Sequence, residues 1–128
     1  MDEALFSFRG VGLTTDGQPR LVDVDLEVAD RAITVIVGAS GSGKSSLLRL
    51  CNRLEAPTTG TVLFRGQDLD RVDVRAHRRR VGMLFQKPTP FAGTVQQNLL
   101  VAEPSLDDGT AAGLLERVGL DADLLGRS

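Results

Sequence analysis

One stretch of this sequence restricts the fold more than any other: GASGSGKS, residues 38–45. It fits the pattern G-x-x-x-x-G-K-S/T at every position, follows an apolar, β-branched run at 32–37, and leads into leucines at helical spacing. A glycine loop between a strand buried on both faces and a helix is typical of parallel α/β sheets. The sequence therefore predicts an α/β fold with a buried strand at Ala32–Val37 and a helix over Gly43–Arg53.

The same loop has the composition of a phosphate-binding cradle. A triphosphate must be met by several backbone N–H groups, and only a loop with few side chains lets the backbone come close enough. The N-terminus of the following helix adds free N–H groups and the positive end of its dipole. We predict that Lys44 reaches the β- and γ-phosphates of a nucleoside triphosphate, Ser45 ligates Mg²⁺ and Ser46 donates to the α-phosphate. The predicted nucleotide-binding residues are Gly38, Ala39, Ser40, Gly41, Ser42, Gly43, Lys44, Ser45 and Ser46.

A flexible linker is the plain alternative for a segment this rich in glycine and serine. A linker would not follow a buried strand, and it would not lead straight into a leucine-rich helix. The order strand, loop, helix therefore favours binding of a nucleoside triphosphate.

Composition narrows the classes of partner. The 128 residues carry a formal net charge of −2, so no overall basic field attracts nucleic acid or anionic lipid. The single cysteine, Cys51, permits no internal disulfide and lies among leucines, which predicts a small core residue. The only histidine, His77, lies in a charged run and is predicted to be solvated. The run Arg78–Arg80 is interpreted as a solvated helix end rather than a DNA contact.

Hydrophobic periodicity predicts the remaining elements. Val22–Val28 alternates with acidic residues at period two, which indicates an antiparallel edge strand with one wet face. Further strands are predicted at Leu5–Leu13, Thr61–Phe64 and, buried on both faces, Val81–Phe85. Helices are predicted at Val72–Arg79 and at Leu106–Val118, the latter capped by Ser105, with one more turn at Asp121–Leu125.

Three segments around the loop resemble the ATP-binding subunit, or nucleotide-binding domain, of ABC transporters. "LVDVDLEV" is similar to the family's strand before the phosphate loop, and "LEAPTTGTVLFRGQDL" to its turn and strand after the first helix. "RRRVGMLFQKPTPFAGTVQQNL" is similar to the strand that ends in the family's Q-loop. The resemblance implies a P-loop NTPase core with an antiparallel β subdomain over residues 1–86. It implies the beginning of a helical subdomain over residues 87–128.

The resemblance also implies roles for residues outside the loop. Gln86 corresponds to the Q-loop glutamine, which in the family contacts Mg²⁺ or its water; a surface glutamine that ends a strand is the alternative. The expected catalytic residues are Lys44 and Gln86, and the expected metal ligands are Ser45 and Gln86. Phe91, Val95 and Leu99 are expected to line a groove for a helix of the transmembrane permease subunit, or else to form a small local core. In the family, two ATPase subunits pair head to tail.

The chain departs from the family pattern at three places. Thr15 stands where relatives often stack adenine on an aromatic ring, and the chain has no Tyr or Trp, so we expect weaker nucleotide affinity or looser base choice. Arg31 stands at a turn that usually carries glycine. The sequence ends at Ser128, before the family's signature, Walker B aspartate, catalytic glutamate and switch histidine. We therefore expect a truncated chain that is poorly stable and binds MgATP. Whether this chain hydrolyses ATP is not decided by its residues, because those that would orient the attacking water are absent from the sequence.

These features together predict the ATP-binding subunit (N-terminal portion) of an ABC transporter, peripheral on the cytoplasmic face of the inner (plasma) membrane. In intact form it would couple ATP hydrolysis to transport. "FQKPTPF" resembles phosphate importers, and "PTPFAGTVQQNL" with "LLERVGL" resembles small ATPases of metal exporters, so both cargoes stay open. The alternatives are a catalytically incompetent nucleotide-binding module and a non-transport ABC protein. The latter usually carries long coiled-coil or zinc insertions, which this sequence lacks.

Overall fold

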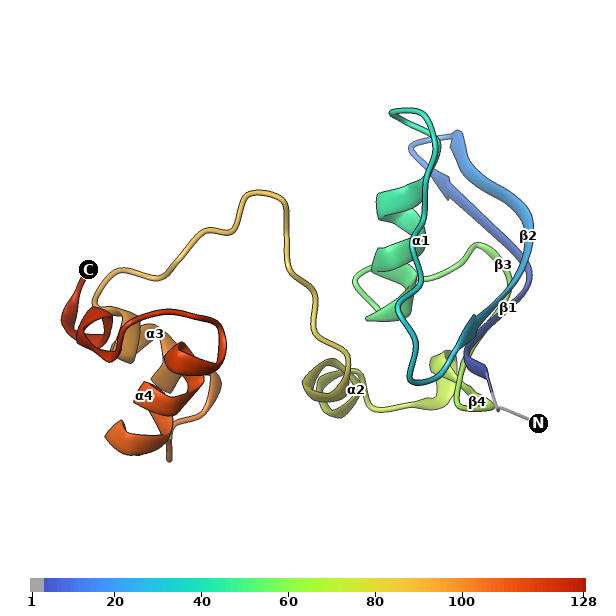
Figure 1. Ribbon diagram of the computed structural model, residues 1–128. Helices are drawn as coiled ribbons and strands as arrows, with labels where there is room; N and C mark the ends of the chain where they lie inside the picture. The colour runs from blue at the N-terminus through green and yellow to red at the C-terminus, as the bar shows by residue number, and fades with distance from the viewer. Residues whose placement is uncertain (1–3) are drawn as a thin grey trace. The chain divides into compact units, whose positions relative to one another are not determined.

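The computed structural model describes residues 4–128, which form two compact units (Figure 1). The first unit extends to Met83 and contains a β-sheet, and the second, Leu84–Ser128, is helical. The boundary predicted from the sequence, after residue 86, lies a few residues further along the chain. Within the described residues, neither unit contains a helix that is long and apolar enough to cross a bilayer.

A four-stranded antiparallel sheet in the order β2-β1-β3-β4 forms the first unit. Its strands are β1 (Ala4–Thr15), β2 (Gln18–Ala29), β3 (Thr59–Phe64) and β4 (Gln67–Asp68). β1 and β2 form a hairpin whose turn residues, Asp16 and Gly17, have φ angles of 51° and 73°. Two successive left-handed residues fit the twist of a tight hairpin. β2 is an edge strand, as its alternating pattern predicts.

Helix α1 (Lys44–Cys51) lies against one face of this sheet (Figure 1). Leu47 and Leu50, one turn apart on the helix, are buried. They pack with side chains from the same face of the sheet and the turn that follows it: Phe6, Phe8, Val11, Val62, Phe64 and Leu69. Cys51 packs against this cluster, and burial raises the pKa of its thiol to about 11. Cys51 is thus partly buried at the edge of the core rather than within it, and its thiol stays protonated at neutral pH.

The segment after β4 brings a histidine into this core. A short 3-10 helix, η1 (Leu69–Arg71), precedes helix α2 (Val74–Arg80). The solvated position predicted for His77 is wrong, because its ring is 4% exposed and meets the Phe64 ring edge-on with centroids 5.1 Å apart. The Nε2–H of His77 donates to the carbonyl of Cys51 over 2.7 Å, which satisfies a polar atom that burial removes from water. The burial of His77 could not be predicted from the hydrophobic pattern, because the residue that faces the core from α2 is itself polar and lies between arginines.

Both predicted buried strands are wrong: Ala32–Val37 and Val81–Phe85 form no strand. Ile33 and Val37 are 95% and 85% exposed, and Leu84 is 88% exposed. A central parallel strand is held by hydrogen bonds to neighbours on both sides. Among the described residues, the strands of the sheet pair only with one another, so these segments have an extended preference but no neighbour.

Two helices and a 3-10 turn make up the second unit: α3 (Val95–Ala102), α4 (Asp108–Arg117) and η2 (Ala122–Gly126). The sequence predicts η2 and most of α4, but the N-cap of α4 is Asp107, not Ser105. Helix α3 was not predicted from the sequence, although its start carries a capping box. The side chain of Thr94 accepts from the N–H of Gln97, and the Gln97 side chain accepts from the N–H of Thr94.

Candidate functional site

The glycine loop closes around the side chain of Lys44, the first residue of α1. Its ammonium group donates to the carbonyl oxygens of Gly38 (2.7 Å) and Ala39 (2.6 Å) and to the hydroxyl of Ser42 (3.3 Å). The N–H of Ser42 donates to the carbonyl of Ala39 over 3.2 Å, which closes the turn. The ammonium group therefore lies within the loop and is held there by neutral oxygen atoms.

Helix α1 begins without a side-chain cap. Its N-cap is Gly43, and no side chain accepts a hydrogen bond from the first turn. The first N–H groups of a helix have no partner inside the helix, and the helix dipole adds partial positive charge there. The hydroxyl groups of Ser45, which is exposed, and Ser46, which is half-buried, belong to the same turn. Free N–H groups, one ammonium and two hydroxyls form an arrangement suited to a polyanion.

Two loop glycines have backbone angles that an L residue resists. Gly41 and Gly43 have φ angles of 78° and 97°. A Cβ atom at Gly43 would lie 2.8 Å from both the Arg20 carbonyl oxygen and a Leu21 methyl group, whereas one at Gly41 would meet open space. At Gly38, a Cβ would come within 2.9 Å of the Ser42 hydroxyl, which can rotate away. The loop therefore depends on Gly43 for both its backbone angle and its close approach to β2.

The remaining predicted site residues belong to different parts of the chain. Ala39 and Ser40 are exposed on the loop itself, and Thr15 ends β1 with a partly exposed side chain. Gln86 is exposed in the coil before α3 and belongs to the second unit. Arg31 has a φ angle of 53°, so the position where relatives carry glycine does require a left-handed residue.

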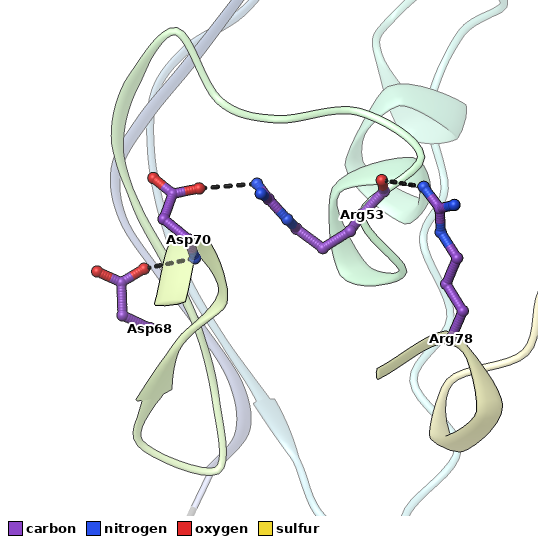
Figure 2. Close-up of polar contacts among 4 residues, drawn as sticks. All are labelled: Arg53, Asp68, Asp70 and Arg78. Atoms are coloured by element: carbon purple, nitrogen blue, oxygen red, sulfur yellow. Dashed lines mark hydrogen bonds and ion pairs between the residues drawn. The ribbon is translucent and has the colours of Figure 1, made fainter. Parts of the chain in front are cut away.

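Sequence reasoning missed the contacts that fix the far end of α1. Figure 2 shows Arg78 directed at the backbone of Arg53, and Arg53 directed at Asp70. Arg78 Nε donates to the carbonyl of Asn52 (3.2 Å), and its Nη2 donates to that of Arg53 (2.5 Å). The predicted solvated helix end is therefore wrong in part: Arg78 is bonded, and Arg80 lies 5.0 Å from the ring centroid of a core phenylalanine. The bonds to Asn52 span 26 residues, so no local pattern reveals them.

A hollow of about 640 Å³ lies in the second unit, lined in part by Phe91, Val95 and Leu99. Phe91 is 65% exposed, which argues against the small local core that was the alternative. Asn98 fixes the chain at its rim: Oδ1 accepts from the N–H of Phe91 (2.8 Å), and Nδ2 donates to the carbonyls of Phe91 (3.0 Å) and Thr94 (2.9 Å). The sequence analysis did not single out Asn98, although an asparagine next to a capping box is a recognisable signal.

Known proteins resemble this chain along most of its length. The family model described as ABC transporter matches residues 21–126. Protein STAR1 of Oryza sativa subsp. japonica is 44% identical over 112 residues, which cover 84% of this chain and 32% of that protein. The phosphate import ATP-binding protein PstB of Pyrobaculum aerophilum is 52% identical over 76 residues, covering 56% and 30%. The solved structure of a bacterial Atm1-family ABC exporter with ATP bound matches 98% of this chain and 22% of its own, with a TM-score of 0.81 and 27% identity. The chain thus spans about a third of the length of these curated relatives.

Proposed function

The chain belongs to the ABC transporter family, of whose ATP-binding domain it carries part, and from this premise we propose that residues 38–46 bind the phosphates of MgATP. The position of the Lys44 ammonium, inside the loop at the uncapped start of α1, carries this proposal. Charged phosphate oxygens are stronger acceptors than the neutral carbonyls of Gly38 and Ala39. A bound triphosphate would therefore take over the ammonium group, while the N–H groups of the first helical turn complete its coordination.

The residues present also fit the metal that accompanies the nucleotide. Mg²⁺ prefers oxygen ligands and keeps several of its waters, so one hydroxyl and one amide oxygen suit it. We assign the hydroxyl ligand to Ser45 at the start of α1 and, from the resemblance to the family's Q-loop alone, the amide ligand to Gln86. The bound metal would offset phosphate charge. Thr15 offers no aromatic ring on which the base could stack. We therefore propose that contacts to the phosphates supply most of the binding and that the affinity for the nucleotide is low.

For the whole protein, the proposed function is the ATP-binding subunit of a transporter on the cytoplasmic face of a membrane. A second ATPase subunit would complete the nucleotide site, and ATP hydrolysis would drive transport. The apolar hollow beside Phe91 would hold a helix of the permease subunit. Phosphate or a metal ion is the proposed cargo, and the identity of residues shared with the phosphate import protein favours phosphate.

Replacing Lys44 tests the phosphate site directly. In Lys44→Ala, we expect MgATP affinity, measured by isothermal titration calorimetry, to fall roughly tenfold to a hundredfold, because charged hydrogen bonds are lost. Arg71→Ala is the matched control, since Arg71 is exposed at the end of η1 and loses the same charge. Unchanged binding in Lys44→Ala would show that the phosphates lie elsewhere.

Replacing Phe91 tests the permease contact. The protein would be co-expressed with the permease subunit of a phosphate importer, and their association followed by co-purification from solubilised membranes. Phe91→Asp would place a charge in the apolar hollow and is expected to abolish association. Leu120→Asp, at an exposed leucine of the same unit, is the control and is expected to retain it. Equal association of both variants would contradict the assigned contact.

A further inference from the structure

Helix α1 has only eight residues, so its position depends on what holds its two ends. Isolated helices of this length are marginal in water. The N-terminal end carries Lys44 and the loop. At the other end, the last carbonyl groups of a helix have no partner inside it and need outside donors.

Two neighbouring residues of α2 supply those donors. His77 Nε2 donates to the carbonyl of Cys51 (2.7 Å), and Arg78 donates to the carbonyls of Asn52 (3.2 Å) and Arg53 (2.5 Å). Three successive carbonyls thus bond to α2: that of Cys51, the last residue of α1, and those of Asn52 and Arg53 in the turn that ends the helix. A guanidinium group also interacts favourably with the negative end of the helix dipole.

This contact is anchored on both sides. Figure 2 shows a chain of polar contacts in which Arg53 Nη1 pairs with Asp70 (2.7 Å) while the N–H of Asp70 donates to Asp68 (2.9 Å). Arg53 also has a φ angle of 61°, so the backbone leaves α1 in a defined, left-handed turn. The sheet holds the other side, because the buried ring of His77 packs on Phe64.

We propose that Arg78 is a positioning residue for the nucleotide site, acting through the carbonyls of Asn52 and Arg53 in the turn that ends α1. The proposal rests on the proposed function of residues 38–46. By holding the end of α1, Arg78 fixes the direction in which the first-turn N–H groups and Lys44 face the loop. The same α2 helix ends at Arg80 and continues directly into the segment that contains Gln86. One guanidinium group therefore connects the loop helix to the chain leading to the predicted metal ligand.

The test compares Arg78→Ala, Arg78→Lys and, as control, Arg79→Ala at the exposed neighbouring arginine. MgATP affinity is expected to fall about tenfold in Arg78→Ala and to stay unchanged in Arg79→Ala. Arg78→Lys keeps the charge but cannot bond two carbonyls with a planar fork, so its affinity is expected to lie between them. Equal affinities in the three folded variants would overturn the proposal. If Arg78→Ala does not fold, Arg78→Lys alone decides.

A nucleotide-free readout separates this inference from the proposed function. In ¹H–¹⁵N spectra recorded well below the unfolding midpoint, the amide signals of Gly41 and Gly43 are expected to shift in Arg78→Ala but not in Arg79→Ala. A purely structural role would lower the unfolding midpoint and leave those distant signals in place, which would overturn the inference. If the wild-type chain binds no MgATP, the proposed function fails, yet the glycine signals still decide whether Arg78 positions the loop.

Discussion

At the scale of single residues, the loop rests on two glycines whose surroundings differ. Gly41→Ala places a side chain in open space at a φ angle of 78°, and about 1–2 kcal/mol of strain is expected. Gly43→Ala adds a contact of 2.8 Å with the backbone of Arg20, so it is expected to destabilise the chain further and to abolish MgATP binding. Urea unfolding and nucleotide titration of the two variants measure both effects. Equal losses in both would mean that the contact with β2 has no role.

The thiol of Cys51 reports on the core. Burial raises its pKa from 9.0 to about 11, so the folded chain holds the protonated form. At pH 8, labelling by Ellman's reagent is expected to be about a hundredfold slower than in the urea-unfolded chain, because the thiolate is the reacting form. The stability that comes from the neutral thiol is complete below pH 9.0 and is lost as the pH rises toward 11. Equal labelling rates in the two states would contradict the burial of Cys51.

Local pattern indicates some candidate site residues, whereas long-range contacts involve others that no local pattern indicates. Residues 38–46 stay a predicted site, proposed from the sequence because the motif is contiguous and each residue type has a reason within it. The contacts of His77 and Arg78 could not be predicted, because their partners are the last residue of α1 and the turn after it, more than twenty residues earlier in the chain. A charged run reads as solvated unless the fold supplies carbonyl groups for it.

At the scale of elements, each helix of the second unit depends on its N-terminal cap. The N–H of Thr110 donates to the carboxylate of Asp107, and the hydroxyl of Thr110 donates to it as well. These two bonds, the first with the larger effect, lower the pKa of that carboxyl below its ordinary value of 3.8. Asp107→Ala is expected to lower the unfolding midpoint, whereas Ser105→Ala is expected to change it little, because Ser105 only bonds within its own turn. Circular dichroism on heating compares the two.

The same cap predicts a dependence on pH. A carboxyl whose pKa is lowered in the folded state contributes stability that is present above pH 3.8 and is lost as the pH falls through the folded-state value. The difference in midpoint between wild type and Asp107→Ala is therefore expected to shrink in acid. A difference that grew with acidity would show that the carboxylate does not cap α4.

Hydrophobic periodicity predicted the elements that are amphipathic in themselves. It failed for segments that form a strand only when other strands pair with them. The sequence displays directly the alternation of β2, which has one exposed and one half-buried face, and the leucine spacing of α1, which has a buried face. Ala32–Val37 has the composition of a central strand, but composition cannot provide the adjacent strands that would bury it. The expected α/β core is thus represented here by its antiparallel sheet and loop helix.

At the scale of the whole molecule, two units divide the functions that the proposal assigns. The first holds the phosphate loop, and the second holds Gln86 and the apolar hollow beside Phe91. The family could be predicted because three segments match it in order and spacing, and the family model confirms it over residues 21–126. The subfamily and cargo stay predictions, since the similar proteins carry different printed functions, methionine import in one and phosphate import in another.

The exposed segment at 32–37 governs how the chain behaves in solution. Ile33, Val35 and Val37 are 95%, 76% and 85% exposed, and an extended, β-branched segment without a neighbour can pair with another chain. We expect the sedimentation coefficient to rise with protein concentration. Val35→Lys should suppress this rise and change the free energy of unfolding by no more than about 0.5 kcal/mol, because the side chain packs against little. Val22→Lys, on the exposed face of β2, is the control for added charge alone. If both variants suppress association equally, net charge governs it; if neither does, the chain associates through another surface.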